Sequence, residues 1–151
     1  MLLSLVVWIG GIIFFAFVLA PTVFTVLPTR QMAGEVVSRT LFVLHWMGII
    51  SGLVFVVTSM IYARYSTGSA EPLAMRNVLI VAMIALTLIS QFAVGSKMLV
   101  LRNQMVVIDD VPVDDARRVE FNRLHHWSTR LETTVFLLGL AALFLTARQL
   151  K

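Results

Sequence analysis

Four runs of apolar residues, long enough or nearly long enough to cross a lipid bilayer, constrain this chain more than any other feature. A bilayer core of about 30 Å requires about 20 apolar residues in a helix. The last run has only 15 residues, so its helix must extend into the polar segment before it. The 13% of charged residues also falls well below the about 25% typical of soluble domains. The runs are Leu2–Leu27, Leu41–Ala63, Val78–Ser96 and Thr133–Ala147.

These runs predict an all-α fold: an integral membrane four-helix bundle with up-down-up-down topology. We expect a single transmembrane domain over residues 1–151, because no second compositional block is present. The polar connections contain Pro28, Gly68 and Pro112, which favour turns. Either Asp114 or Asp115 is expected to cap the last helix. The predicted spans are residues 2–27, 36–64, 76–101 and 115–148.

Basic residues are expected to decide the orientation of the bundle. We call face B the end that holds the first and third connections, and face A the end that holds both termini and the second connection. Face B carries eight basic residues and face A four, and the positive-inside rule therefore predicts that face B is cytoplasmic. Both termini would then lie outside a membrane that we expect to be a bacterial inner membrane. The basic residues are Arg30, Arg39, Lys97, Arg102, Arg117, Arg118, Arg123 and Arg130 on face B, and Arg64, Arg76, Arg148 and Lys151 on face A.

Polar residues within the spans gather toward face B, whereas the half of each span near face A is almost purely apolar. Polar and ionisable groups in a membrane usually face the bundle interior or a water-filled cavity. The one-sided distribution therefore predicts a polar pocket that opens toward face B. Its expected members are Gln91, Ser128, Glu132 and Lys97, together with His45 and His125.

His45 and His125 lie at similar distances from the starts of their helices. In an up-down bundle these helices face each other across the core. Two such imidazoles could ligate haem b, or a metal such as copper with help from Met47 or Met98. A plainer interpretation is a buried histidine hydrogen-bonded to Ser, Gln or Glu. A further alternative is a proton-carrying pair with Glu132.

The last helix places His125 on the same stripe as Ser128 and Glu132, and this stripe is predicted to point inward. His126 lies about 100° away and should be more exposed. In the second helix, Gly48 and Gly52 form a small-xxx-small pattern that allows close helix packing. The expected partner surface for this pattern is Gly10 and Gly11 in the first helix.

The motif Phe121-x-Arg123-x-His125-x-x-Ser128 resembles the transmembrane protein 205 family and its bacterial relatives. Trp8-Ile9-Gly10-Gly11 in the first helix also fits these relatives. The resemblance implies a four-helix membrane domain of unknown function, with His125 and Ser128 as its key positions. Relatives often have proline where this chain has Ser96. A looser resemblance connects the Trp-x-Gly opening to small membrane haem proteins.

Several classes of function find no support in the sequence. No nucleophile–base motif, phosphate-binding loop or zinc-ligand spacing is present, and the scattered basic residues argue against a nucleic-acid partner. These observations favour a protein that is not an enzyme. Two functions stay open: a domain that binds haem or a metal, and an accessory subunit of a larger membrane complex without chemistry of its own. Expected partners are membrane lipid, other subunits or further copies of the chain, and a transporter would need such oligomerisation.

Overall fold

The computed structural model describes residues 1–69, 72–105 and 107–149, and every regular element in these ranges is helical. The prediction of an all-α protein is thus confirmed. In chain order the elements are α1 Leu2–Phe14, the π-helix η1 Phe15–Leu19, α2 Ala20–Val26, α3 Arg30–Thr67, α4 Met75–Ile89, the π-helix η2 Ser90–Gly95, α5 Ser96–Met105, the 3₁₀-helix η3 Ile108–Asp110 and α6 Ala116–Gln149.

These elements form four continuous rods that are long and apolar enough to cross a membrane, as far as the described residues go. The first rod joins α1, η1 and α2, and the third joins α4, η2 and α5, whereas α3 and α6 are rods by themselves. Large apolar side chains also cover the outside, for example Leu3 at 76% and Phe17 at 73% exposure. Such an apolar exterior indicates an integral membrane protein.

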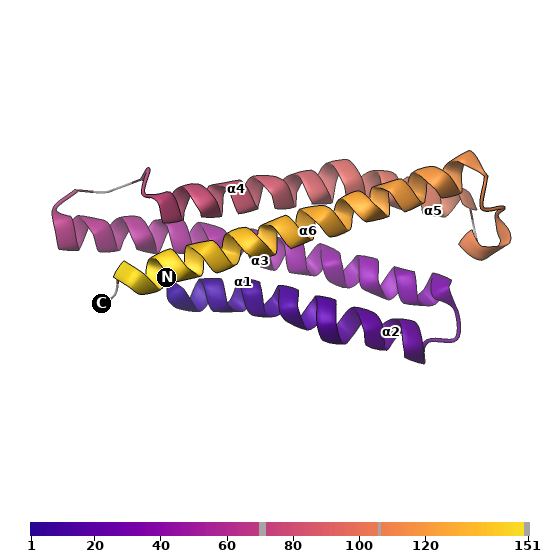
Figure 1. Ribbon diagram of the computed structural model, residues 1–151, viewed down its shortest axis with the longest axis horizontal. Coiled ribbons are helices and arrows are strands. Elements are labelled where there is room, and N and C mark those ends of the chain that lie inside the picture. Colours follow the sequence, from indigo (N-terminus) through magenta and orange to yellow (C-terminus); the bar gives the residue numbers. More distant parts are fainter. Residues whose placement is uncertain (70–71, 106, 150–151) are drawn as a thin grey trace.

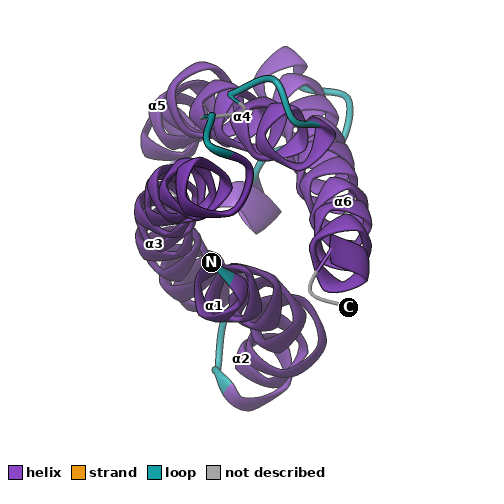
Figure 2. Cartoon of the chain, turned by 90° about the vertical axis from the view of Figure 1, so that its left-hand side faces the viewer, coloured by secondary structure: helices purple, strands orange, loops and turns teal. Residues whose placement is uncertain are grey.

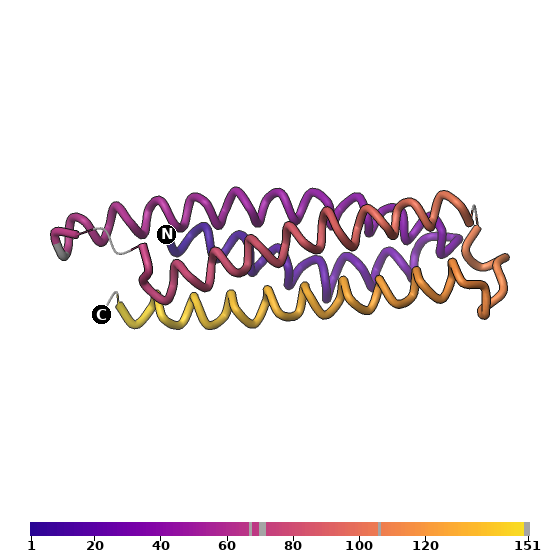
Figure 3. Tube along the Cα trace, turned by 90° about the horizontal axis from the view of Figure 1, so that it is seen from above, coloured from indigo at the N-terminus to yellow at the C-terminus, as the bar shows by residue number. Residues whose placement is uncertain are grey.

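The rods surround one apolar core. Figures 1 and 3 place the two termini and the α3–α4 connection at one end, face A, and the other two connections at the opposite end, face B. Viewed along the bundle, α3 and α6 lie on opposite sides, with the first and third rods between them (Figure 2). Accordingly, both α1 and α4 pack against α3 and α6. Members of the core include Leu5, Trp8, Phe55, Ile80, Met83 and Val135.

The helix α3 begins at Arg30, six residues before the predicted start of its span. Its N-cap is Thr29, whose side-chain oxygen accepts a hydrogen bond from the backbone N–H of Met32 at 3.2 Å. With 38 residues the helix is about 57 Å long, nearly twice the thickness of a bilayer core. Because its apolar run begins only at Leu41, the first turns of α3 extend beyond the lipid at face B.

Two rods contain a π segment, in which the helix has one extra residue within a turn. The first, η1, ends two residues before Pro21, which has no N–H to donate to the carbonyl of Phe17. The second, η2, is followed by Ser96 instead of a proline, so proline is not required for the irregularity there. This second segment carries Gln91, one of the polar residues singled out in the sequence.

Candidate functional site

Three polar side chains from three different rods meet at His45. Its Nδ1 lies 2.7 Å from Oε1 of Gln91 in η2, and its Nε2 lies 2.6 Å from Oε1 of Glu132 in α6. The imidazole is buried, with 3% of the residue exposed, whereas Gln91 and Glu132 are half-buried. We refer to His45, Gln91 and Glu132 as the histidine triad.

The elements that carry the triad explain how it forms. His45 belongs to α3 and Glu132 to α6, two helices on opposite sides of the bundle (Figure 2), so the contact between the two side chains crosses the core. Gln91 approaches from the third rod, as the second residue of its π segment. Because a π turn holds more residues than an α turn, it changes the angular spacing of the side chains it carries. The triad therefore joins three of the four rods through side-chain hydrogen bonds.

The hydrogen bonds of the triad restrict where protons can lie. Each ring nitrogen of His45 lies beside a side-chain oxygen. Two acceptor oxygens are satisfied if the imidazole carries both N–H groups and Glu132 is ionised. Both contacts are also hydrogen bonds if Glu132 is protonated and donates to Nε2, while Nδ1–H donates to Gln91. Both arrangements leave the pair without net charge and hold the same number of protons.

An apolar floor closes the triad on its face A side. His45, Gly48 and Gly52 share one side of α3, and the buried indole of Trp8 in α1 covers both glycines. A Cβ atom on Gly48 would overlap this indole, and one on Gly52 would lie 2.8 Å from Cζ3 of Trp8. Ile84 of α4 also contacts Gly52. The floor is therefore made of apolar side chains from the first and third rods, packed against two glycines of α3.

The other two glycines of the expected packing surface behave differently from each other. A Cβ atom on Gly11 would meet side-chain atoms of Leu44 and Met47, so Gly11 lies against α3. Gly10 is exposed, and a Cβ atom placed on it would have no other helix within 4 Å. The expectation that Gly10 contributes to this contact is wrong within the chain, because the residue faces outward.

Only part of the predicted polar pocket comes together. Gln91 and Glu132 bind His45, as described above. Lys97 is exposed at the start of α5 and Ser128 is half-buried in α6, and neither side chain forms a hydrogen bond within the described ranges. The predicted pocket therefore reduces to the histidine triad, because neither Lys97 nor Ser128 binds its members.

The structure does not place His125 opposite His45. His125 is exposed, and its ring neighbours that of His126 with 6.3 Å between their centroids. In the described chain it has no hydrogen bond to Ser128, Glu132 or Gln91, contrary to our expectation of a sequestered imidazole. Both nitrogens of His45 are already bound to protein oxygens. A haem iron or metal ion at His45 would have to displace Gln91 or Glu132.

The donor set for a metal is correspondingly small. Among the described residues, no group of three or more His, Cys, Asp or Glu side chains is placed to hold a metal ion. The chain has no cysteine, so thiolate ligands are excluded. The geometry therefore supports hydrogen-bonding and proton chemistry at His45 better than ligation.

Sequence reasoning missed two inward-facing arginines, of which Arg76 is buried and Arg102 is half-buried. Near face A, Arg76 is only 4% exposed and its Nε donates to Oγ of Ser59 at 2.7 Å. Near face B, Nη1 of Arg102 donates to the Gly34 carbonyl at 3.0 Å and to Oγ of Ser38 at 2.9 Å. Both residues lie near the ends of apolar runs, and the sequence gives no signal for their inward rotamers.

Comparison with known proteins identifies one match. Residues 3–106 match the model of a protein family described as a domain of unknown function. Neither the curated proteins nor the solved structures contain a match to this chain. The matched segment runs from α1 to the end of α5. It thus includes His45 and Gln91, whereas Glu132 lies beyond it.

Proposed function

The chain belongs to the DUF4149 family of domains of unknown function, and we propose that it binds and releases one proton at the pair formed by His45 and Glu132. The observation that carries this proposal is the pairing of both imidazole nitrogens with side-chain oxygens inside a membrane bundle. Histidine is the side chain whose unperturbed charge changes nearest to neutral pH, and an intramembrane ionisable residue usually has a functional role.

The net charge of the pair formed by His45 and Glu132 depends on this one proton. When the pair holds its proton, His45 and Glu132 together are neutral. Loss of the proton leaves one net negative charge beside a buried imidazole, which is unfavourable in an apolar environment. Gln91 can serve both states, because its amide oxygen accepts a hydrogen bond and its NH₂ group donates one after a half-turn. The triad can therefore stay hydrogen-bonded while the proton comes and goes.

The proposal includes a direction of exchange. Trp8 and Ile84 cover the face A side of the site with apolar atoms. Toward face B, the stripe of α6 that carries Glu132 continues through half-buried Ser128 to exposed His125. These polar side chains favour proton exchange with the solvent at face B.

The placement in the membrane is part of the same proposal. We propose that the chain crosses a bacterial inner membrane in up-down-up-down order with face B in the cytoplasm and both termini outside. The order is supported by the positions of the connections (Figures 1 and 3), and the orientation by the excess of basic residues at face B. Under this orientation the triad exchanges protons with the cytoplasm.

A wider relationship is also proposed. The Phe121-x-Arg123-x-His125-x-x-Ser128 motif supports kinship with the transmembrane protein 205 family, and it lies outside the matched residues 3–106. Within this motif Phe121 is buried, and the guanidinium of Arg102 lies 5.6 Å from its ring centroid. This contact gives the motif a packing role at face B.

The proposal can be tested on a protein with a single histidine. The chain has three histidines, so His125→Gln together with His126→Gln leaves His45 as the only imidazole. Nitrogen NMR of this variant in lipid nanodiscs would follow both ring nitrogens from about pH 4 to about pH 10, a range that includes the ordinary pKa values of Glu and His. Carboxyl carbon NMR would follow Glu132. We expect the imidazole and the carboxyl group to respond together to one proton.

Two controls make the test decisive. Glu132→Gln removes the carboxylate and should abolish the coupled response while the imidazole signal persists. If neither group changes over the pH range, the triad is a fixed packing device, and the accessory-subunit function is the better one. A Soret band or stoichiometric metal in the purified wild-type protein would instead support the haem or metal site at His45 and His125.

A further inference from the structure

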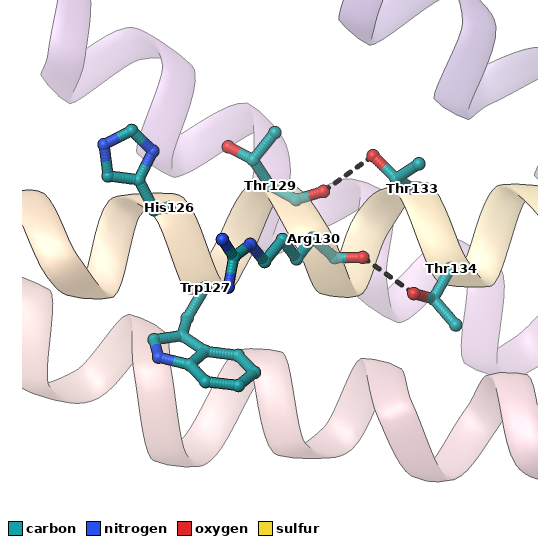
Figure 4. A pocket seen from close by; sticks show the side chains of 6 residues that line it. All are labelled: His126, Trp127, Thr129, Arg130, Thr133 and Thr134. Atoms are coloured by element: carbon teal, nitrogen blue, oxygen red, sulfur yellow. Dashed lines mark hydrogen bonds between the residues drawn. The ribbon is translucent and has the colours of Figure 1, made fainter.

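A second site lies on the outer side of α6, away from the histidine triad. A surface hollow of about 520 Å³ lies in the half of α6 nearer to face B, and Figure 4 shows the side chains that line it. Arg130 extends from its position in the helix back toward the N-terminal end of α6, and its guanidinium lies between the rings of His126 and Trp127 (Figure 4). The lining residues are His126, Trp127, Thr129, Arg130, Thr133 and Thr134.

Arg130 is an exposed cation without an anionic partner in the described ranges. Its guanidinium carbon lies 5.7 Å from the ring centroid of Trp127, a cation–π contact that orients the group without neutralising it. Two other arginines near the start of the same helix are neutralised: Arg117 pairs with Asp115 at 2.9 Å and Arg123 pairs with Glu120 at 2.8 Å. Arg130 is thus available to an external anion.

The hydroxyl groups in the hollow are directed inward to the helix backbone. Thr133 donates to the carbonyl of Thr129 and Thr134 to that of Arg130, both at 2.9 Å (Figure 4). Their polar atoms are therefore occupied, and the hollow becomes apolar in the direction of face A. Farther along the same side of α6, Leu137, Leu140 and Phe144 are 59%, 40% and 61% exposed.

We propose that this hollow binds an anionic phospholipid. Its phosphate would lie beside the guanidinium of Arg130 and the imidazole of His126, and the Trp127 indole would lie at the level of the headgroup. One acyl chain would follow Leu137 and Leu140 toward the middle of the membrane. A lipid fits better than free phosphate because the cationic end continues directly into this apolar track.

Native mass spectrometry with added lipid tests the proposal on the full chain. Phosphatidylglycerol and phosphatidylcholine would be compared on the wild type, on Arg130→Gln and on the matched control Arg123→Gln, whose arginine is already paired with Glu120. We expect the wild type to prefer phosphatidylglycerol, and Arg130→Gln to weaken its binding about fivefold, the effect of one basic residue near a membrane surface. Arg123→Gln should bind like the wild type.

Three results would overturn the proposal. These are equal lipid binding by Arg130→Gln and wild type, an equal loss in Arg123→Gln, and a lipid-free dimer that Arg130→Gln dissociates. The last result would assign the hollow to a second copy of the chain. A fourth result comes from competition with inorganic phosphate: if it displaces phosphatidylglycerol at comparable concentration, the site recognises a free anion and the lipid proposal is wrong. None of these results depends on the titration of His45.

Discussion

The indole of Trp8 rests directly on the backbone of Gly48, so that α1 and α3 touch one helical turn from His45. No residue with a side chain fits at Gly48 unless this ring moves. The contact does two things at once: it holds the first rod against α3, and it closes the apolar floor beneath the histidine triad.

Replacement of Gly48 by leucine should therefore destabilise the bundle. We expect a loss of about 1–3 kcal/mol in the free energy of unfolding, which is typical of an overfilled core. Thermal or denaturant unfolding in detergent would measure it. Gly10→Leu is the matched control, because Gly10 faces outward with open space around it and should tolerate the change. Equal stability of the two variants would contradict the packing described here.

The hydrogen bond between His45 and Glu132 should appear as an energetic coupling. His45→Gln and Glu132→Gln each leave a partner unsatisfied, which costs about 1–3 kcal/mol for a buried group. Because the residues are in contact, the double variant should lose less than the sum, with a coupling of about 0.5–3 kcal/mol. Strictly additive losses would show that the contact contributes nothing.

We predict that Asp115 makes the stability of the start of α6 sensitive to acid. The guanidinium of Arg117 lowers the pKa of the Asp115 carboxyl from its ordinary value to about 2, helped by the backbone N–H of Arg117 at 2.8 Å. A depressed pKa stabilises the fold above the unfolded value, and this contribution is lost as the pH falls toward about 2. Unfolding measured against pH should be flatter between about pH 5 and about pH 2 in Asp115→Asn.

The orientation makes a separate prediction. If face B is cytoplasmic, a reporter fused to the C-terminus and active only in the cytoplasm should be silent. A reporter that works only outside should be active at the same position. The opposite pair of results would reverse the proposed orientation, and the triad would then exchange protons with the outside.

Much of the fold could be predicted from hydropathy, because a bilayer permits few alternatives to apolar helices. The starts of α3 and α6, in contrast, depend on short-range hydrogen bonds at their N-caps. Asp115 was one of two expected caps, whereas Thr29 was missed because the polar first turns of α3 carry no apolar periodicity. Polar helix starts of this kind extend beyond the lipid, where hydropathy does not predict the residue at which a helix begins.

For the site, the sequence predicted which residues belong to it but not how they pair. His45, Gln91 and Glu132 all stand out in the sequence as polar residues within apolar runs, but their mutual pairing depends on how the rods are arranged. His125 shows the limit of helical periodicity. It lies on nearly the same side of α6 as Glu132, yet it is exposed. In the structure α1 packs against α6, whereas α2 packs mainly against α3, so the bundle opens near face B (Figure 1).

The π segment Ser90–Gly95 also bears on changes in chain length. A π turn is equivalent to a one-residue insertion into an α-helix, whose flanking parts keep their faces in phase. Deletion of one residue between Phe92 and Gly95 could therefore be absorbed by an ordinary α-helix without rotating α4 against α5. The same deletion in the middle of α4 would turn everything beyond it by about 100°. The third rod thus contains one short stretch where the gene could lose a codon and the bundle could keep its packing.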